Sequence, residues 1–139
     1  MLDHTVHADL YLESTMDSVL QAAQLAARAA SDAGFLPDDQ QRIGLAVHES
    51  VLNAVSHGNQ FSAEKKVHLV IRNEETKLVV EVEDEGDGFA PDEVPDPCDE
   101  GNLERGSGRG LLIIREYMDQ LEVGRRSPWG ARVRMAKRI

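Results

Sequence analysis

Residues 49–58 read Glu-Ser-Val-Leu-Asn-Ala-Val-Ser-His-Gly, and their polar members recur every four positions, at Glu49, Asn53 and His57. Four residues of an α-helix advance by about 400°, so each of the three is offset by about 40° from the last. A carboxylate, an amide and an imidazole on one stripe suit a hydrated Mg²⁺ ion with an anionic ligand, because Mg²⁺ prefers oxygen donors. An ordinary solvent-facing stripe has the same spacing.

A second signal follows an apolar strand, where residues 84–89 read Asp-Glu-Gly-Asp-Gly-Phe. Asp84 places a carboxylate at the strand end, where it can accept a hydrogen bond from a ligand amine. Gly86 and Gly88 allow positive φ angles and close approach of a ligand to the backbone. A calcium loop would need a twelve-residue ladder ending in glutamate, which this sequence lacks, and a plain turn is the other interpretation.

A third signal is glycine-rich, since residues 106–110 read Gly-Ser-Gly-Arg-Gly before a predicted helix. Backbone N–H groups at the start of a helix bind anions. No Lys-Ser/Thr follows, as a P-loop requires, and no strand precedes, as a dinucleotide fingerprint requires. A flexible linker has a similar composition. The candidate anion-binding residues are Arg105, Gly106, Gly108, Arg109 and Gly110.

The rest of the chain predicts the order β-α-α-β-β-(lid)-α-β-β. Hairpin-linked strands with three helices indicate an α+β fold, a two-layer sandwich of three main helices on one face of a mixed, mostly antiparallel sheet. The irregular stretch 90–108 contains three prolines and is long enough to be a functional lid. The expected strands are 6–12, 67–71, 78–82, one at Val123 and 131–135. The first expected helix runs from a Ser14 or Thr15 cap to Gly34, and the second from Pro37 to His57-Gly58-Asn59. The third follows Gly110 and includes Leu111, Ile114, Met118 and Leu121.

Length and composition limit the class of protein. The chain has 139 residues, which predicts one domain over 1–139, and 41% hydrophobic with only 4% aromatic residues, which predicts an aliphatic core. A net charge of −10 argues against direct nucleic-acid binding. The single cysteine, Cys98, excludes a disulfide framework. Without a run of about 20 apolar residues or a signal-peptide layout, we expect a cytoplasmic protein with no membrane segment.

The three signals occur in the order of the N, G1 and G2 boxes, and the chain resembles the GHKL (Bergerat-fold) ATP-binding superfamily, with its histidine-kinase-like ATPase fold. Residues 49–58 resemble in particular the N box of the stand-alone anti-sigma-factor serine kinases. The resemblance extends from the first strand to the last.

The resemblance implies ATP and Mg²⁺ as cofactors. Asn53 would ligate Mg²⁺, Asp84 would accept the adenine amino group, and Glu49 would act as general base. His57 would lie near the phosphates. Gly86 and Gly88 would pass close to the nucleotide; Gly106, Gly108 and Gly110 would form the hinge and phosphate cradle of an ATP lid over 90–108, with Arg109 beside them and Arg105 reaching phosphate or a partner.

The sequence departs from the wider superfamily in two ways that limit which branch and which roles we expect. The 13 residues before the first helix are too short for the phosphoacceptor helix of a two-component histidine kinase, and no transducer domain follows. The lid is acidic, and its carboxylates would repel a triphosphate, so we expect them to face solvent or a partner; they are Asp92, Glu93, Asp96, Asp99 and Glu100.

The resemblance therefore predicts an ATP-dependent protein serine/threonine kinase that regulates transcription by partner switching. It would bind a sigma factor or equivalent regulator and phosphorylate an anti-anti-sigma protein with a STAS domain. A homodimer is implied, with the first strand as a candidate contact because an edge strand needs protection. The alternative is a nucleotide-gated protein-binding module without significant kinase activity. A third interpretation is a small interaction protein with coincidental glycines.

Overall fold

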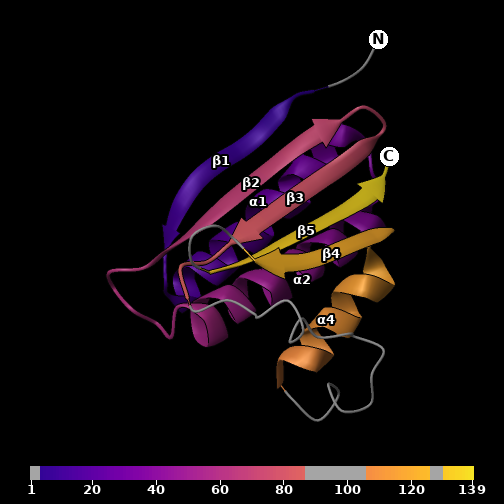
Figure 1. The fold of residues 1–139 in the computed structure, drawn as a ribbon. Helices are drawn as coiled ribbons and strands as arrows, with labels where there is room; N and C mark the ends of the chain where they lie inside the picture. The colour runs from indigo at the N-terminus through magenta and orange to yellow at the C-terminus, as the bar shows by residue number, and fades with distance from the viewer. Residues whose placement is uncertain (1–3, 87–105, 126–129) are drawn as a thin grey trace.

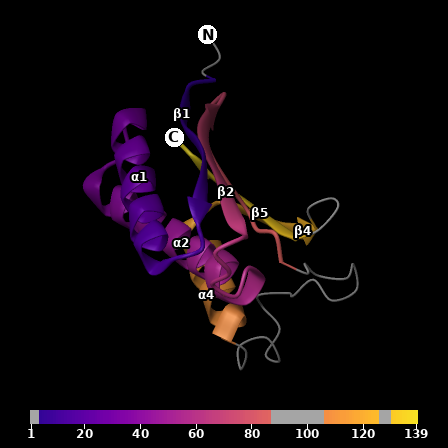
Figure 2. The same cartoon turned by 90° about the vertical axis from the view of Figure 1, so that its left-hand side faces the viewer.

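Five strands form one sheet and the helices cover one of its faces in the computed structural model, which describes residues 4–86, 106–125 and 130–139. The strands are β1 Val6–Glu13, β2 Lys66–Glu74, β3 Lys77–Glu83, β4 Gln120–Arg125 and β5 Ala131–Arg138. The helices are α1 Met16–Ala33, α2 Pro37–Asn53, the π-helical turn η1 Ala54–Gly58, and α4 Gly106–Tyr117. Figures 1 and 2 show the two layers from the front and from the side.

The order of strands across the sheet is β1-β2-β3-β5-β4. All four pairings between these strands are antiparallel, so the predicted α+β sandwich is confirmed without a parallel pair among the described strands. β1 and β4 are the edges, whereas β5, the last strand along the chain, lies inside the sheet (Figure 1).

Local chemical signals set the ends of the first two helices. Thr15 caps α1, its side-chain oxygen accepting a hydrogen bond from the Ser18 N–H at 3.2 Å. Gly34 ends α1 with a φ of 99°, a left-handed conformation that glycine adopts without steric cost. α2 begins at Pro37, whose missing N–H needs no partner in a first turn. These predictions are confirmed.

The third helix differs from the prediction. It begins at Gly106 and not after Gly110, so the end of the predicted lid belongs to α4, whereas its other residues lie outside the described ranges. Each glycine lowers helix propensity by about 1 kcal/mol relative to alanine, but tertiary packing overrides propensity. That packing is visible at Ile114, which is fully buried, and in the contact of α4 with α2. Leu121 lies in β4, opposite Met135, because the helix ends at Tyr117.

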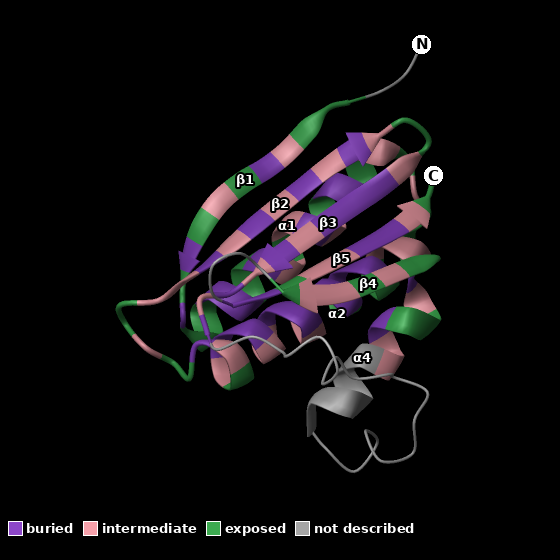
Figure 3. Cartoon of the chain, viewed as in Figure 1, coloured by how far each residue is buried: buried purple, intermediate pink, exposed green. Residues whose placement is uncertain are grey.

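The core between the two layers is aliphatic, as the composition predicts. Along β2, buried and partly exposed residues alternate, and the same alternation gives the striped strands of Figure 3. The buried side chains of β2 belong to the same core cluster as buried residues of α1 and α2. The largest fully buried residues include Ile43, Val47, Leu69, Ile71, Leu78, Ile114 and Met135.

The opposite face of the sheet carries charged side chains, which we call the outer-face ion network: Arg72, Glu74, Glu81, Arg132 and Arg134. Arg72 donates to Glu81 at 2.9 Å and to Glu74 at 3.1 Å. Arg132 also donates to Glu81, and Arg134 contacts Glu74 at 3.3 Å. The bond from Arg72 lowers the pKa of Glu74, and the bond to Glu81 raises the pKa of Arg72.

Candidate functional site

The predicted polar stripe exists on α2 but does not continue regularly to His57. Glu49 and Asn53 lie in α2 and are half-buried. At its end the chain widens into η1, where backbone hydrogen bonds span five residues instead of four. The offset of about 40° applies only to a regular α-helix, so His57, which is exposed, leaves the predicted alignment. Single π-helical turns inside α-helices occur frequently at functional sites.

Glu49 has a histidine beside it. Its Oε1 atom lies 3.7 Å from Nδ1 of His48, and the two side chains are 22% and 28% exposed. The Nδ1 atom of His48 is buried and has no hydrogen-bond partner among the described residues. A partly exposed carboxylate of this kind can take a proton from a hydroxyl group placed next to it, which is the chemistry of a general base.

Asp84 is buried at the end of β3, with 5% of its surface exposed. Its Oδ1 atom accepts hydrogen bonds from the backbone N–H groups of Gly86 and Ala131, both at 3.0 Å. Its own N–H donates to the Ala131 carbonyl at 3.0 Å. β3, the turn after it and β5 therefore fix the carboxylate from the backbone.

Three glycines lie around Asp84 at distances that no side chain would allow. A Cβ atom at Gly58 would lie 2.2 Å from Oδ2 of Asp84, and one at Gly86 would lie 2.1 Å from the Gly58 carbonyl oxygen. A Cβ atom at Gly130 would lie 1.9 Å from the Asp84 carbonyl oxygen, and Gly130 also has a φ of 108°. Through Gly58, the end of the α2 stripe and the end of β3 come together in one place.

Of these three glycines, only Gly86 is predicted from the sequence to lie at the site. Gly58 is expected from the sequence only as part of the end of a helix. The position of Gly58 directly after the polar stripe could have indicated its role, because the end of a helix that carries ligand-binding groups is a place where another segment of the site can pack. Asn59 is also missed, although it is the polar residue that follows, and it is buried to 1% exposure.

The glycine-rich segment lies in the first turns of α4. Gly106, Gly108, Arg109 and Gly110 are helical there, which corrects the prediction that they form a loop before the helix. The first four N–H groups of a helix lack partners within it, so an anion-binding function for this segment agrees with either conformation. Gly88 and Arg105 lie outside the described residues, as do Cys98 and Trp129.

Mg²⁺ and a nucleotide place different demands on this site. Within the described ranges, no three His, Cys, Asp or Glu side chains come together as a metal site. Asn53 fits a metal that binds through one protein oxygen and otherwise through phosphates and water, as Mg²⁺ commonly does. The Asp84 carboxylate is a group that can accept a hydrogen bond from the amino group of a nucleotide base.

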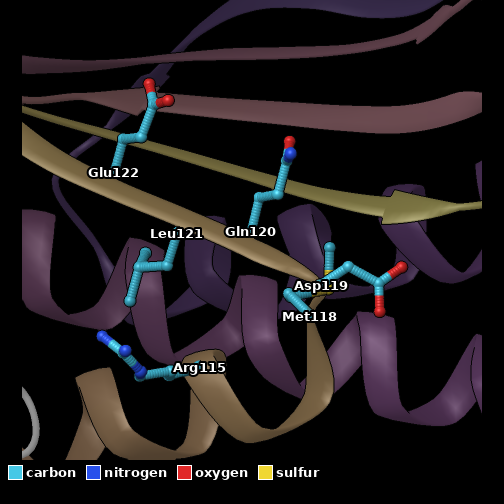
Figure 4. Close-up of a pocket in the computed structure, with 6 residues that line it drawn as sticks. All are labelled: Arg115, Met118, Asp119, Gln120, Leu121 and Glu122. Atoms are coloured by element: carbon cyan, nitrogen blue, oxygen red, sulfur yellow. The ribbon is translucent and has the colours of Figure 1, made fainter.

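A hollow of about 400 Å³ lies elsewhere, between α4 and β4 (Figure 4). Arg115 lines it from α4, and Gln120, Leu121 and Glu122 line it from β4, where the side chain of Leu121 points toward α4. Glu49, Asn53 and Asp84, predicted site residues that the structure describes, do not line it. No helix in the described part of the chain has the length and hydropathy to span a bilayer.

Comparison with known proteins places this geometry in a family. The model of the histidine kinase-like ATPase domain matches residues 12–137. The anti-sigma F factors of Bacillus thuringiensis (strain Al Hakam), Bacillus mycoides (strain KBAB4) and Bacillus cereus (strain AH187) are each 33% identical to the chain over 103 residues. Each match covers 72% of this chain and 70% of the relative.

Solved structures agree on the fold. A mycobacterial sensor histidine kinase, MprB, superposes with a TM-score of 0.56 at 16% identity, covering 95% of this chain and 99% of that one. Full-length ShkA, solved in complex with AMPPNP, gives a TM-score of 0.58 at 22% identity and covers 99% of this chain but 31% of that one.

Proposed function

The chain belongs to the histidine kinase-like ATPase domain family, and we propose that it is an ATP-dependent protein serine/threonine kinase of the anti-sigma-factor type. The observation that carries the proposal is the meeting of the α2 stripe with the buried Asp84 carboxylate at Gly58. The 33% identity with anti-sigma F factors supports the choice of branch within the family.

The nucleotide would lie beside the end of β3 and the polar stripe of α2. Asp84 accepts the amino group of adenine, which selects adenine over guanine because guanine presents a carbonyl oxygen at that position. Asn53 holds Mg²⁺, and the N-terminal turns of α4 meet the phosphates. When bound, Mg·ATP supplies the phosphoryl group and the divalent charge that phosphoryl transfer needs.

Glu49 would act on the acceptor protein. Its carboxylate orients the serine or threonine hydroxyl and takes its proton, a contribution worth about 10²–10⁴ in rate. His57 and Arg105 would contact phosphate or the partner protein. In this scheme the chain acts in the cytoplasm and as a homodimer, binds a sigma factor or equivalent regulator, and phosphorylates an anti-anti-sigma protein with a STAS domain.

The test incubates the purified protein with Mg²⁺, labelled ATP and the STAS-domain proteins of the same genome. We expect label on a serine or threonine of one of them. Glu49→Ala should bind ATP normally and lose transfer by about 100-fold or more. Gln41→Ala, on an exposed position of the same helix, is the matched control and should change neither.

Asp84→Asn separates binding from chemistry. Asparagine keeps an oxygen for the N–H groups of Gly86 and Ala131, so the fold should persist while the affinity for ATP falls. Tight ATP binding with no label on any candidate would favour the nucleotide-gated binding module. Failure of the unmodified protein to bind any adenine nucleotide would contradict both.

A further inference from the structure

Asn59 joins three segments of the chain through its side-chain amide. Its Nδ2 group donates to Oγ of Ser14 and to the carbonyl oxygen of Lys66, both at 3.0 Å. Its Oδ1 atom accepts a hydrogen bond from the N–H of Glu85 at 2.8 Å. We call these three bonds the Asn59 clamp. Both N–H donors and the oxygen of the amide are used, which is the condition under which a buried polar network is stabilising.

Further bonds close the clamp into a ring. Ser14 donates from Oγ to the Lys65 carbonyl at 2.6 Å, and the Glu85 carboxylate accepts from the Lys66 N–H. Glu85 is therefore held twice, by its backbone to Asn59 and by its side chain to the start of β2. Glu85 directly follows Asp84. The clamp bond to its backbone and the bond to its side chain therefore fix the turn that carries the Asp84 carboxylate.

The packing around the clamp leaves little room for movement. Gly58, directly before Asn59, lies against the Asp84 carboxylate, and Gly86, directly after Glu85, lies against the Gly58 carbonyl. Close-packed interiors transmit small displacements to their neighbours. A shift of Glu85 relative to Asn59 would therefore move Asp84 relative to the helix that carries Asn53.

We propose that Asn59 is a positioning residue: it sets the place of the Asp84 carboxylate relative to α2, and through it the affinity and base selectivity for nucleotide. This inference rests on the proposed function, because it assumes that Asp84 reads the base. Asn59 would take no part in phosphoryl transfer, since its three polar groups are all bound within the protein.

The test compares Asn59→Ala with Ser14→Ala. The first removes the whole clamp, whereas the second removes a partner on the side away from Asp84 and leaves the Glu85 bond intact. We expect Asn59→Ala to weaken ADP binding by about tenfold and to reduce the ADP-to-GDP preference. In the phosphorylation assay it should raise KM for ATP by a similar factor and leave kcat within about twofold. Ser14→Ala should bind ADP within about twofold of the unmodified protein.

A merely structural role for Asn59 would give a different result. Both variants would then lower the unfolding midpoint while the ADP affinity and the ratio of ADP to GDP affinity stayed unchanged. Alternatively, Asn59→Ala would lower kcat by as large a factor as it raises KM. Either outcome overturns the inference. If Asn59→Ala does not fold, Asn59→Ser decides, because serine keeps a polar group at this buried position but has a single donor and cannot make all three bonds of the clamp. We expect it to weaken ADP binding by about two- to fourfold, and unchanged binding would overturn the inference.

Amide hydrogen exchange tests the clamp without nucleotide. In the nucleotide-free protein, Asn59→Ala should speed exchange at the Glu85 N–H, and Ser14→Ala should not. Unchanged exchange at Glu85 would overturn the clamp itself. If exchange responds as expected but the unmodified protein binds no nucleotide, the proposed function fails and the base-reading part of the inference fails with it, while the clamp stands.

Discussion

Glu81 and Asp84 are separated along the chain only by Val82 and Glu83, yet their surroundings differ in kind. Glu81 receives its hydrogen bonds from the long side chains of Arg72 and Arg132 on the outer face of the sheet. Asp84 receives its bonds from backbone N–H groups and lies against glycines. Side chains can rearrange when a partner changes, but backbone in a packed sheet cannot. Substitutions around Asp84 should therefore destabilise the protein strongly, whereas substitutions in the outer-face ion network should have small effects.

The strongest attempt to break this contrast is Gly130→Ala. A Cβ atom there would collide with the Asp84 carbonyl, and the φ of 108° is unfavourable for alanine. Overpacking and the left-handed backbone together should lower the free energy of unfolding by about 3 kcal/mol in urea titrations at pH 7. Gly124→Ala is the control, because apart from its chain neighbours no atom of the described residues lies within 4 Å of its Cβ position, and it should change stability by less than about 0.5 kcal/mol. Equal losses of stability in the two variants would show that the backbone around Asp84 can shift to make room for a side chain.

Gly58→Ala tests the same turn from the helix side. Its Cβ atom would meet the Asp84 carboxylate, a side chain, so some relaxation is available. We expect a loss of about 2 kcal/mol in the free energy of unfolding, together with weaker ADP binding by calorimetry. A stable variant that keeps its ADP affinity would mean that the carboxylate has room to move, and the contrast with Glu81 would fail.

Glu81→Gln tests the outer-face ion network through the pH dependence of stability. Burial acts to raise the pKa of Glu81, but hydrogen bonds from Arg72 and Arg132 outweigh it and hold the pKa below the ordinary value of 4.5. A carboxyl group with a lowered folded pKa stabilises the fold above the unfolded value, and this contribution disappears as the pH falls through the folded pKa. We expect the variant to be about 1 kcal/mol less stable at pH 7, with the difference vanishing at low pH. A difference that persists in acid would point to packing and not to charge.

The smallest effect should come from Glu74→Gln. Glu74 is 40% exposed at its side chain, and both its partners also contact Glu81. Exposed pairs of this kind contribute about 0.5 kcal/mol or less, and salt screens them further. Urea unfolding at 50 mM and 500 mM salt should give nearly the same difference from the unmodified protein. A loss as large as that of Glu81→Gln would show that the network acts as one unit.

The parts of the fold with a local cause can be predicted from the sequence. Thr15, Gly34 and Pro37 fix helix ends through bonds and backbone angles within a few residues, and the alternation along β2 follows from one buried face. The predicted place of Asp84 at the end of an apolar strand is also confirmed. In each case the residue type and its neighbours contain the whole signal.

The missed features depend on segments that meet only after folding. The start of α4 at Gly106 depends on packing against α2, because three glycines favour a loop on local grounds. The π-helical turn η1 leaves no mark in the sequence, since its residues also fit a regular helix. Gly130 matters through its contact with Asp84, and nothing near it in sequence reveals the partner.

The inner position of β5 has a consequence for the time at which the site becomes available. The Asp84 carboxylate and N–H both bond to Ala131, the first residue of that strand, so the site is incomplete until 131–138 have left the ribosome and inserted between β3 and β4. Pairing across such long stretches of sequence is slow compared with forming a helix. A nascent chain without β5 would therefore lack the complete Asp84 site, and ligand binding there, which stabilises only the folded state, would report that this strand had been inserted.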